Sequence, residues 1–428
     1  MSFDRQLAEF AVAAVPPAAA LDIMRLSLFD WAACGVAGCD QPVARAVGRM
    51  VRAEGGAGQA ALIGGGRAPA RGAALVNGAA SHALDFDDTH FGHIGHPSVA
   101  VLPAALATAE HVGAAGPEML AAALVGAELS VRLGLWLGRG HYRGGFHQTA
   151  TAGAFGATAA AARLRRADVT QMRMALGLAA TRAAGLKSQF GTMGKPYNAG
   201  IAAATGVECA LLAMDGFVSE PDGLSVAQGF GPTHMGAADS AAALQGLGRD
   251  WLMERVSHKF HACCHGTHAA LEALGALGGA GLGEVTAVRI ITHPAWMNVC
   301  NIRVPATGLE AKFSYRFTAA MALSGHDTGR AAGFTDALTG DPALVALRDR
   351  VDVVADDAVA ETAARVRVTL ADGRTLAAEH DLARPVPAGQ LQTRLRQKAG
   401  TLVASARADQ LWRAVQGPAI APLVAALA

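Results

Sequence analysis

The chain has 428 residues, of which 52% are hydrophobic and 17% are charged, and its formal net charge at pH 7 is +1. This length exceeds a single compact core and predicts two domains. The near-neutral charge and the lack of basic runs argue against a nucleic-acid partner. The longest charge-free runs contain too many Gly, Thr and His residues to span a membrane.

The scarcity of charge instead indicates an Ala-rich helical body that is buried extensively and completed by oligomerisation. Asp4, Arg5 and Glu9 stand where a secretory signal needs a basic start and an apolar core. The six cysteines have no framework spacing, as expected for reduced thiols in the cytoplasm. These features predict a soluble cytoplasmic protein.

Helical periodicity runs from Phe3 to about Leu252, interrupted by one short strand expected in AALIGG. The pattern then changes. Val285–Thr292 alternates and is β-branched, and two further alternating runs meet at Asp372-Gly373, which predicts a hairpin. Helical sequence returns near the C-terminus.

We therefore expect a mainly α fold with a large helical domain and a smaller α+β lid domain. The expected boundaries are 1–256 for the first part of the helical domain, 257–387 for the lid and 388–428 for the return to the helical domain. No repeat of 20 to 50 residues is present.

The Gly-rich segment EGGAGQAALIGGGRAPARGAALVNG contains neither GxGxxG nor Gly-Lys-Ser/Thr. Its glycines are better explained by turns and close packing than by a nucleotide site.

The most unusual stretch is SHALDFDDTHFGHIGHPS, with four histidines and three carboxylates in residues 81–98. Gly92, Gly95 and Pro97 predict a loop between helices. A metal site, an acid/base site and caps for the following helix are all compatible with this composition. The polar residues are too dense for capping alone.

A second cluster, HKFHACCHGTH, begins at His258. It resembles a zinc site in composition, but Cys263 and Cys264 are adjacent, so both cannot easily bind one tetrahedral ion.

Two polar islands interrupt apolar sequence: GGFHQTATAGAFG contains His147, and LKSQFGTMGKPYNAG contains Lys187 and Lys195. A lysine in such surroundings is costly to bury without an anion. Together with the histidines of the other segments, these islands favour one convergent site for an anion.

In this order, these segments resemble the MmgE/PrpD family, which includes 2-methylcitrate dehydratase, cis-aconitate decarboxylase and iminodisuccinate epimerase. The resemblance covers nearly the whole chain. It is carried by VNGAASHALDFDDTH, HPSVAVLPAALATAE, GGFHQTATAGAFGATAAAA, GTMGKPYNAG, CALLAMDGF, KFHACCHGTH and EAKFSYRFTAAMAL. It implies a helical domain with a lid, a homodimer, and no metal or organic cofactor.

The resemblance also implies a pocket whose residues match the family motifs one by one. His96, Lys195 and His147 are the expected catalytic residues. The expected substrate-binding residues are Asp85, Thr89, Lys259 and Cys264.

Three positions depart from the family pattern. The decarboxylase branch has histidine where Cys264 stands, which argues against decarboxylation of cis-aconitate. The family often has histidine at the position of Asn198. The tyrosine expected near the KFS motif has no counterpart, because Tyr315 is displaced and Arg316 or Phe317 aligns there.

The expected function is that of a cofactor-independent lyase of the dehydratase type, acting on a small di- or tricarboxylate by removing a proton α to a carboxylate. His96 and Lys195 share proton transfer and charge stabilisation, while His147 binds substrate or serves as a second acid. Lys259 holds a carboxylate, Asp85 orients a histidine, and Thr89 donates a hydrogen bond.

An epimerase of an iminodisuccinate-like dicarboxylate is the alternative, because both reactions begin with the same proton abstraction. A metal hydrolase and a non-catalytic carboxylate-binding dimer also stay open. His82, Asp87 and Asp88 are expected to support the loop or cap the next helix. Four histidines have no assigned role: His90, His93, His261 and His265.

Overall fold

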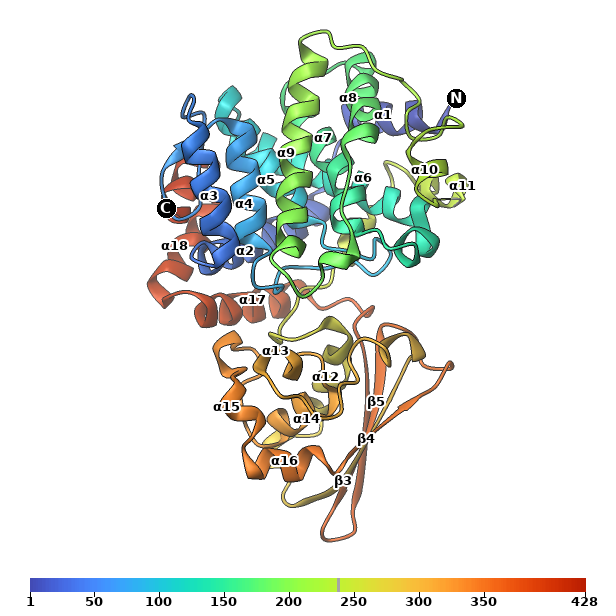
Figure 1. The fold of residues 1–428 in the computed structure, drawn as a ribbon, viewed down its shortest axis with the longest axis vertical. Helices are drawn as coiled ribbons and strands as arrows, with labels where there is room; N and C mark the ends of the chain where they lie inside the picture. Colours follow the sequence, from blue (N-terminus) through green and yellow to red (C-terminus); the bar gives the residue numbers. More distant parts are fainter. Residues whose placement is uncertain (237–238) are drawn as a thin grey trace. The chain divides into compact units, whose positions relative to one another are not determined.

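The computed structural model describes residues 1–236 and 239–428 and divides into two compact units (Figure 1). The helical domain comprises residues 1–258 and 395–428, and the smaller α+β domain comprises residues 259–394. The expected mainly α fold with a smaller α+β domain is confirmed. The contacts place the two junctions at 259 and 394, compared with 257 and 387 in the sequence interpretation.

The helical domain is built from helices and one short two-stranded ribbon. Its elements are α1 (Phe3–Ala13), α2 (Ala18–Gly38), α3 (Pro42–Glu54), β1 (Ala60–Ala61), β2 (Arg67–Ala68), α4 (Ala70–Ser81), α5 (Ser98–Val112), α6 (Gly116–Arg143), α7 (Gln148–Leu164), α8 (Val169–Arg182), α9 (Gly194–Met214), α10 (Phe230–Thr233), α11 (Ser240–Leu244), α18 (Ser405–Gln416) and α19 (Ile420–Leu427).

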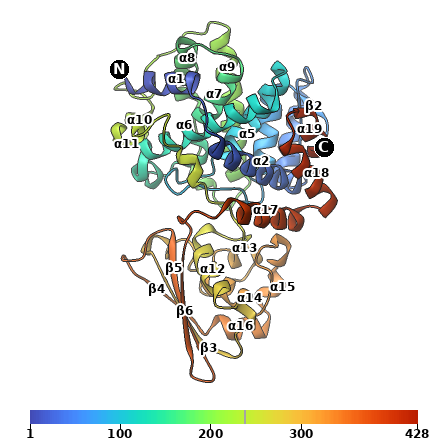
Figure 2. The same ribbon diagram turned by 180° about the vertical axis from the view of Figure 1, so that it is seen from behind.

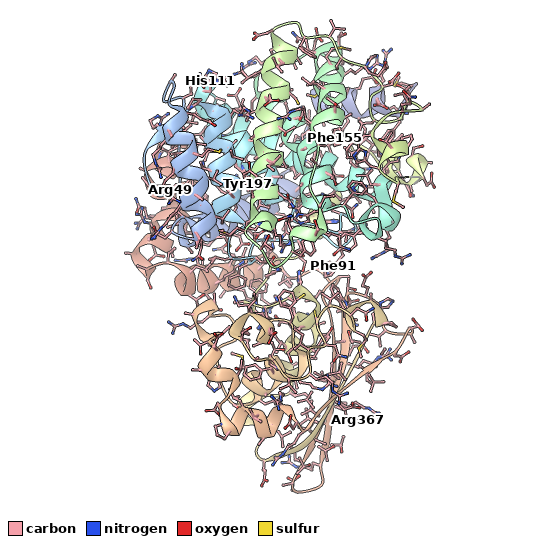
Figure 3. All side chains as sticks on the ribbon, viewed as in Figure 1. Arg49, Phe91, His111, Phe155, Tyr197 and Arg367 are labelled. Atoms are coloured by element: carbon pink, nitrogen blue, oxygen red, sulfur yellow. The ribbon has the colours of Figure 1, made fainter. Side chains whose placement is uncertain are left out.

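Alanine and glycine allow the central helices to approach closely. Helix α7 packs against both α6 and α9, and α4 packs along α9. A Cβ atom at Gly78 of α4 would lie 2.9 Å from Gly200 Cα of α9, so neither position has room for a side chain. Larger residues such as Phe155 fill the remaining interior of the domain (Figure 3).

Among the described residues, two single helices, α6 and α9, are long and apolar enough to cross a membrane. In their most apolar stretches, 89% and 67% of the residues are buried inside the protein. Core packing therefore accounts for their composition, and α6 in addition carries the fully buried ion pair of Glu128 and Arg132.

The smaller domain contains a four-stranded sheet in the order β4-β3-β5-β6. Strand β3 runs parallel to β4 and antiparallel to β5, which forms a hairpin with β6. The strand and the hairpin expected from the sequence are confirmed. The elements of this domain are α12 (His268–Ala276), β3 (Val285–Thr292), α13 (Gly308–Ala311), α14 (Tyr315–Leu323), α15 (Asp336–Thr339), α16 (Pro342–Arg348), β4 (Val351–Ala355), β5 (Ala363–Leu370) and β6 (Thr375–Asp381).

Helix α17 (Ala388–Leu402) contains the second junction between the two units. After it, α18 and α19 return to the helical domain and pack against α2 (Figure 2). The C-terminal helices are therefore part of the same core as the N-terminal helices.

Candidate active site

The polar cluster of the helical domain is built on residues 82–97, here called the site loop, which connects α4 to α5. Phe91, labelled in Figure 3, marks this loop. The tight packing of Gly78 on Gly200 fixes α4 against α9, the helix whose first turn carries Lys195. Two segments more than 100 residues apart in the chain therefore meet at one place.

The buried side of the cluster is one carboxylate between two imidazole rings. Asp87 Oδ1 lies 2.9 Å from His82 Nδ1, and Asp87 Oδ2 lies 2.7 Å from His96 Nδ1. The two rings face each other edge-on with centroids 4.5 Å apart. Asp87 and His82 are fully buried, so these contacts are shielded from water.

The accessible side is formed by Asp85, Lys195 and the edge of His96. Asp85 Oδ2 lies 2.6 Å from Lys195 Nζ, and Asp85 Oδ1 lies 3.4 Å from His96 Nε2. The side chain of Asp85 is 37% exposed, against 15% for Lys195 and 10% for His96. A ligand that reaches this cluster therefore meets these three groups before the buried Asp87.

Asp85 adopts a left-handed backbone conformation with φ 51°. Aspartate tolerates this region better than most residues, but the conformation still persists only where neighbouring groups hold it. Its backbone N–H donates to the carbonyl of His82. This turn allows Asp85 and Asp87 to contact different edges of the His96 ring.

His147 precedes α7 and lies next to this cluster. Its ring stacks at 6.1 Å on His82 and meets the ring of Phe190 edge-on at 5.0 Å. The side-chain amide of Asn198 donates to His147 Nδ1 at 3.3 Å. Because Nδ1 accepts this bond, the neutral ring carries its proton on Nε2 and can donate it to a ligand.

Charge within the cluster is unevenly distributed. Burial raises the pKa of Asp87, but the charges and hydrogen bonds of His82 and His96 outweigh burial and hold that pKa well below its usual value. Burial, reinforced by the neighbouring charges of His82 and Lys195, keeps the pKa of His147 well below its usual value. The cluster thus contains a carboxylate that stays ionised, Asp87, and an imidazole that stays neutral, His147.

Asp88 has a different environment from Asp87. Ser98, the first residue of α5, donates to Asp88 through its backbone N–H at 3.3 Å and its hydroxyl at 2.5 Å. Burial raises the pKa of Asp88 to about 7, with the charges of Asp30 and Asp87 adding to the effect. Asp88 therefore supports the start of α5, in the capping role that the sequence suggested.

Three other residues of the loop hold its shape. Thr89 exchanges two backbone hydrogen bonds with Ser257, at 2.8 and 2.7 Å, and its hydroxyl lies 3.4 Å from the Ser257 carbonyl. His90 Nε2 lies 2.9 Å from the Leu252 carbonyl, and His93 Nε2 lies 2.9 Å from the Ser130 hydroxyl. Burial lowers the pKa of His90 to about 4 and that of His93 to about 3.

The loop is also the one place, among the residues described, where donor atoms are grouped closely enough for a metal ion. Atoms of His82, Asp85, Asp87 and His96 all lie within 4.8 Å of one another. Their donor atoms already face each other, and Lys195 contacts one of the carboxylates. A cation would have to displace the Lys195 ammonium, so the cluster suits a ligand that is an anion better than a metal.

The comparisons with known proteins cover both domains. The model of the MmgE/PrpD N-terminal domain matches residues 5–243, and that of the MmgE/PrpD C-terminal domain matches residues 261–416. The chain belongs to the MmgE/PrpD family.

Three curated relatives are 30–35% identical to the chain over the matched segments. A human cis-aconitate decarboxylase is 31% identical over 60% of this chain and 56% of its own length. A cis-aconitate decarboxylase-like protein of Aspergillus oryzae is 30% identical over 60% of this chain and 57% of its own. The mouse cis-aconitate decarboxylase is 35% identical over 39% of this chain and 35% of its own. The chain thus spans little more than half of the first two relatives and about one third of the mouse protein.

Of the seven site residues that the MmgE/PrpD resemblance implied, the structure brings four into one cluster: Asp85, His96, His147 and Lys195. Thr89 lies in the same loop.

Lys259 and Cys264 belong to the smaller domain. Lys259 is buried near Cys263 and His268. Burial raises the pKa of Cys263 to about 12, which the charge of Lys259 opposes, and burial lowers the pKa of His268, to which the charge of Lys259 adds. The half-buried Cys264 donates its backbone N–H to the carbonyl of Lys312 at 2.9 Å.

The displaced tyrosine has structural partners. The Tyr315 hydroxyl donates to the Gly266 carbonyl at 2.7 Å and lies 2.9 Å from the hydroxyl of Thr292. These contacts explain why Tyr315 is buried in the core of the smaller domain.

Two members of the cluster, His82 and Asp87, were expected only to support the loop. The His82 ring packs edge-on against the His96 ring, and Asp87 makes a shorter contact with His96 than Asp85 does. No local signal in the sequence predicts these contacts, because the segment is a loop and the contacts depend on the left-handed turn at Asp85.

Proposed function

We propose that the protein is a cofactor-independent lyase that acts on a small di- or tricarboxylate and transfers a proton at a carbon next to a carboxylate. Three observations support this function: membership of the MmgE/PrpD family, the lyase activity named for its relatives, and the contact chain Lys195–Asp85–His96–Asp87. The contact chain carries the proposal, because it places a cation beside a histidine held by a carboxylate.

Lys195 would receive a carboxylate of the substrate. One of its three N–H donors faces Asp85, and the ammonium lies 5.5 Å from the Phe190 ring, which shields it in part from water. Proton removal next to a carboxylate builds negative charge on that carboxylate. A fixed ammonium in a partly desolvated site stabilises this charge more in the transition state than in the ground state.

His96 would carry the proton. Its short contact with the ionised Asp87 favours a proton on Nδ1, which leaves Nε2 on the accessible side as the atom that exchanges protons with substrate. Asp85 lies between His96 Nε2 and Lys195 and orients both groups. When a substrate carboxylate binds, it replaces Asp85 as the partner of the Lys195 ammonium. His147, neutral and protonated on Nε2, would donate to a leaving group or a substrate oxygen.

The reaction type has two leading candidates. Loss of water is the dehydratase reaction that the sequence analysis favours. Decarboxylation is favoured by the relatives, which are named cis-aconitate decarboxylases. Cys264, where the decarboxylase branch has histidine, is the residue that weighs against the second candidate. Epimerisation of a dicarboxylate shares the same first step and is the third outcome of the test.

Product analysis distinguishes these reactions. EDTA-dialysed protein is incubated separately with cis-aconitate, citrate, malate, succinate and aspartate derivatives, and the products are identified by NMR. New double bonds, released CO₂ and inverted stereocentres report dehydration, decarboxylation and epimerisation respectively. We expect turnover of at least one compound without metal. Turnover that requires added zinc would support a metal hydrolase instead, and binding without turnover would support a non-catalytic carboxylate-binding protein.

A homodimer and a cytoplasmic location are the remaining parts of the proposal. Both rest on composition and on the family resemblance, and both are open to measurement by sedimentation and by cell fractionation.

A further inference from the structure

A buried lysine lies directly behind the site loop. Lys398 belongs to α17, and its side chain is 2% exposed. Its Nζ lies 2.6 Å from Asp30 Oδ1 of α2 and donates at 2.6 Å to the backbone carbonyl of Phe86. The same ammonium lies 4.2 Å from the centre of the Phe86 ring.

The position of this carbonyl gives the contact its importance. Phe86 stands between Asp85 and Asp87, the two carboxylates that contact the His96 ring. A hydrogen bond to the Phe86 carbonyl fixes the plane of the peptide that joins Phe86 to Asp87. The direction of the Asp87 side chain toward His96 follows from that plane.

Burying an ammonium so completely requires compensation. Burial lowers the pKa of Lys398, but the charge of Asp30, with smaller effects of Cys34 and Asp87, outweighs burial and leaves the pKa above its ordinary value. The lysine therefore stays charged, and it donates a charge-assisted hydrogen bond to a neutral carbonyl. Two apolar side chains in place of Asp30 and Lys398 could fill the same space, but neither could donate a hydrogen bond to the Phe86 carbonyl.

We propose that Lys398 is a positioning residue: it holds the Phe86–Asp87 peptide so that Asp87 meets His96 in the orientation needed for proton transfer. This inference rests on the proposed function for its kinetic consequence but not for its structural one. It assigns a role in the site to α17, more than 300 residues after the loop that it holds.

The test is a double variant, Asp30→Asn/Lys398→Met, which removes both buried charges together and so avoids leaving one unpaired. The matched control is Glu128→Gln/Arg132→Met. Glu128 and Arg132 form another fully buried pair, 2.7 Å apart. Glu128 accepts from the backbone N–H of Met253 and Arg132 donates to the carbonyls of Ala243 and Asp250, and none of these bonds is to Asp85, Phe86 or Asp87. Both variants are assayed at a temperature where circular dichroism shows them folded.

We expect kcat of Asp30→Asn/Lys398→Met to fall about tenfold or more, with KM changed less than about threefold, because the lost contact orients a proton-transfer group. The midpoint of its pH–kcat profile should move by about half a unit or more, since the proton affinity of an imidazole depends on the carboxylate that it contacts. The control should keep the wild-type midpoint.

Imidazole ¹⁵N spectra provide a second reading that needs no turnover. The His96 signals, identified by their loss in His96→Ala, should titrate differently in Asp30→Asn/Lys398→Met and as in wild type in the control. An unchanged His96 titration, or the same change in both variants, would overturn the role of Lys398. If wild type turns over no carboxylate, the proposed function fails while this spectrum still decides the positioning role.

Discussion

Two segments hold eight of the fifteen histidines of this chain, yet they are built differently. In the site loop, Asp85 and Asp87 contact His82 and His96, and Lys195 completes the cluster. In residues 258–268 the ring nitrogens lie mainly beside hydroxyls and backbone carbonyls: His258 beside the Ser27 hydroxyl, His261 beside the Thr328 hydroxyl, and His268 beside the Cys263 carbonyl.

The difference lies in how the carboxylates are used. His261 does reach one, Glu272, at 3.3 Å, but the same carboxylate also binds Arg394, so its charge is already neutralised. Burial raises the pKa of Glu272, and its bonds to His261 and Arg394 reverse this and lower it to about 2. We therefore base the proposed proton-transfer site on the carboxylate that two imidazoles share near Lys195, and not on histidine density.

The largest expected effect is that of removing the cation. Lys195→Met should lower turnover about 10²–10³-fold, because the charge that develops on a substrate carboxylate loses its partner. The matched control is Lys187→Met, since Lys187 stands in the same segment but binds the Tyr142 carbonyl and ring. Steady-state assays should show the control within about threefold of wild type. Equal losses in both variants would mean that the segment, not the Lys195 ammonium, matters.

Next is the shared carboxylate of the site loop. Asp87→Asn should lower kcat about tenfold to a hundredfold, because an amide cannot accept from both imidazoles and so no longer fixes the proton of His96. Asp88→Asn changes the neighbouring carboxylate and should leave kcat within about threefold of wild type. If Asp88→Asn proves the more damaging variant, the assignment of the two aspartates is reversed.

Asp88 also predicts how the stability of the protein depends on pH. The pKa of Asp88 is raised to about 7 in the folded protein from 3.8, so the folded state binds its proton more tightly than the unfolded state does. The resulting stabilisation is complete below pH 3.8 and is lost as pH rises toward 7. The free energy of unfolding of Asp88→Asn, measured in urea, should therefore rise relative to that of wild type by about 2–3 kcal/mol as the pH increases from 5 to 8. A constant difference across that range would show that Asp88 is ionised in the folded protein.

The smallest effect is expected in the second segment. His261→Gln removes one contact to Glu272 but leaves Arg394 in place, so it should cost about 1 kcal/mol of unfolding free energy and change turnover less than about threefold. A loss of turnover comparable to that of His96→Ala would break the distinction between the two segments.

Much of the fold could be predicted from local pattern. Val285–Thr292 has strand alternation, and Asp372-Gly373 closes a hairpin whose strands are β5 and β6. Strand β4 was missed because VDVVA, residues 351–355, is short and directly follows a helix. Its pairing is parallel to β3, more than 60 residues earlier, and no local signal predicts such a partner.

The site loop shows a similar limit. Gly92, Gly95 and Pro97 predicted a break between helices, and α4 and α5 do end and begin at Ser81 and Ser98. The contact of Asp87 with both imidazoles could not be predicted, because it depends on the left-handed turn at Asp85. Lys398 was not singled out, since only the folded chain brings α17 behind Phe86.

We propose that the cluster of His96 and Lys195 transfers a proton at a carbon next to a carboxylate. Deuterium incorporation tests it most directly, with the turned-over carboxylate incubated in D₂O and followed by NMR for wild type, His96→Ala and Lys187→Met. For decarboxylation or epimerisation, we expect deuterium at that carbon of the product with wild type and Lys187→Met. For dehydration, we expect it in the hydroxy acid formed from the unsaturated product in the hydration direction. In either case the rate should be lower by about 10²-fold or more with His96→Ala. Absence of deuterium from these compounds, or an unchanged rate in His96→Ala, would contradict this role of the cluster.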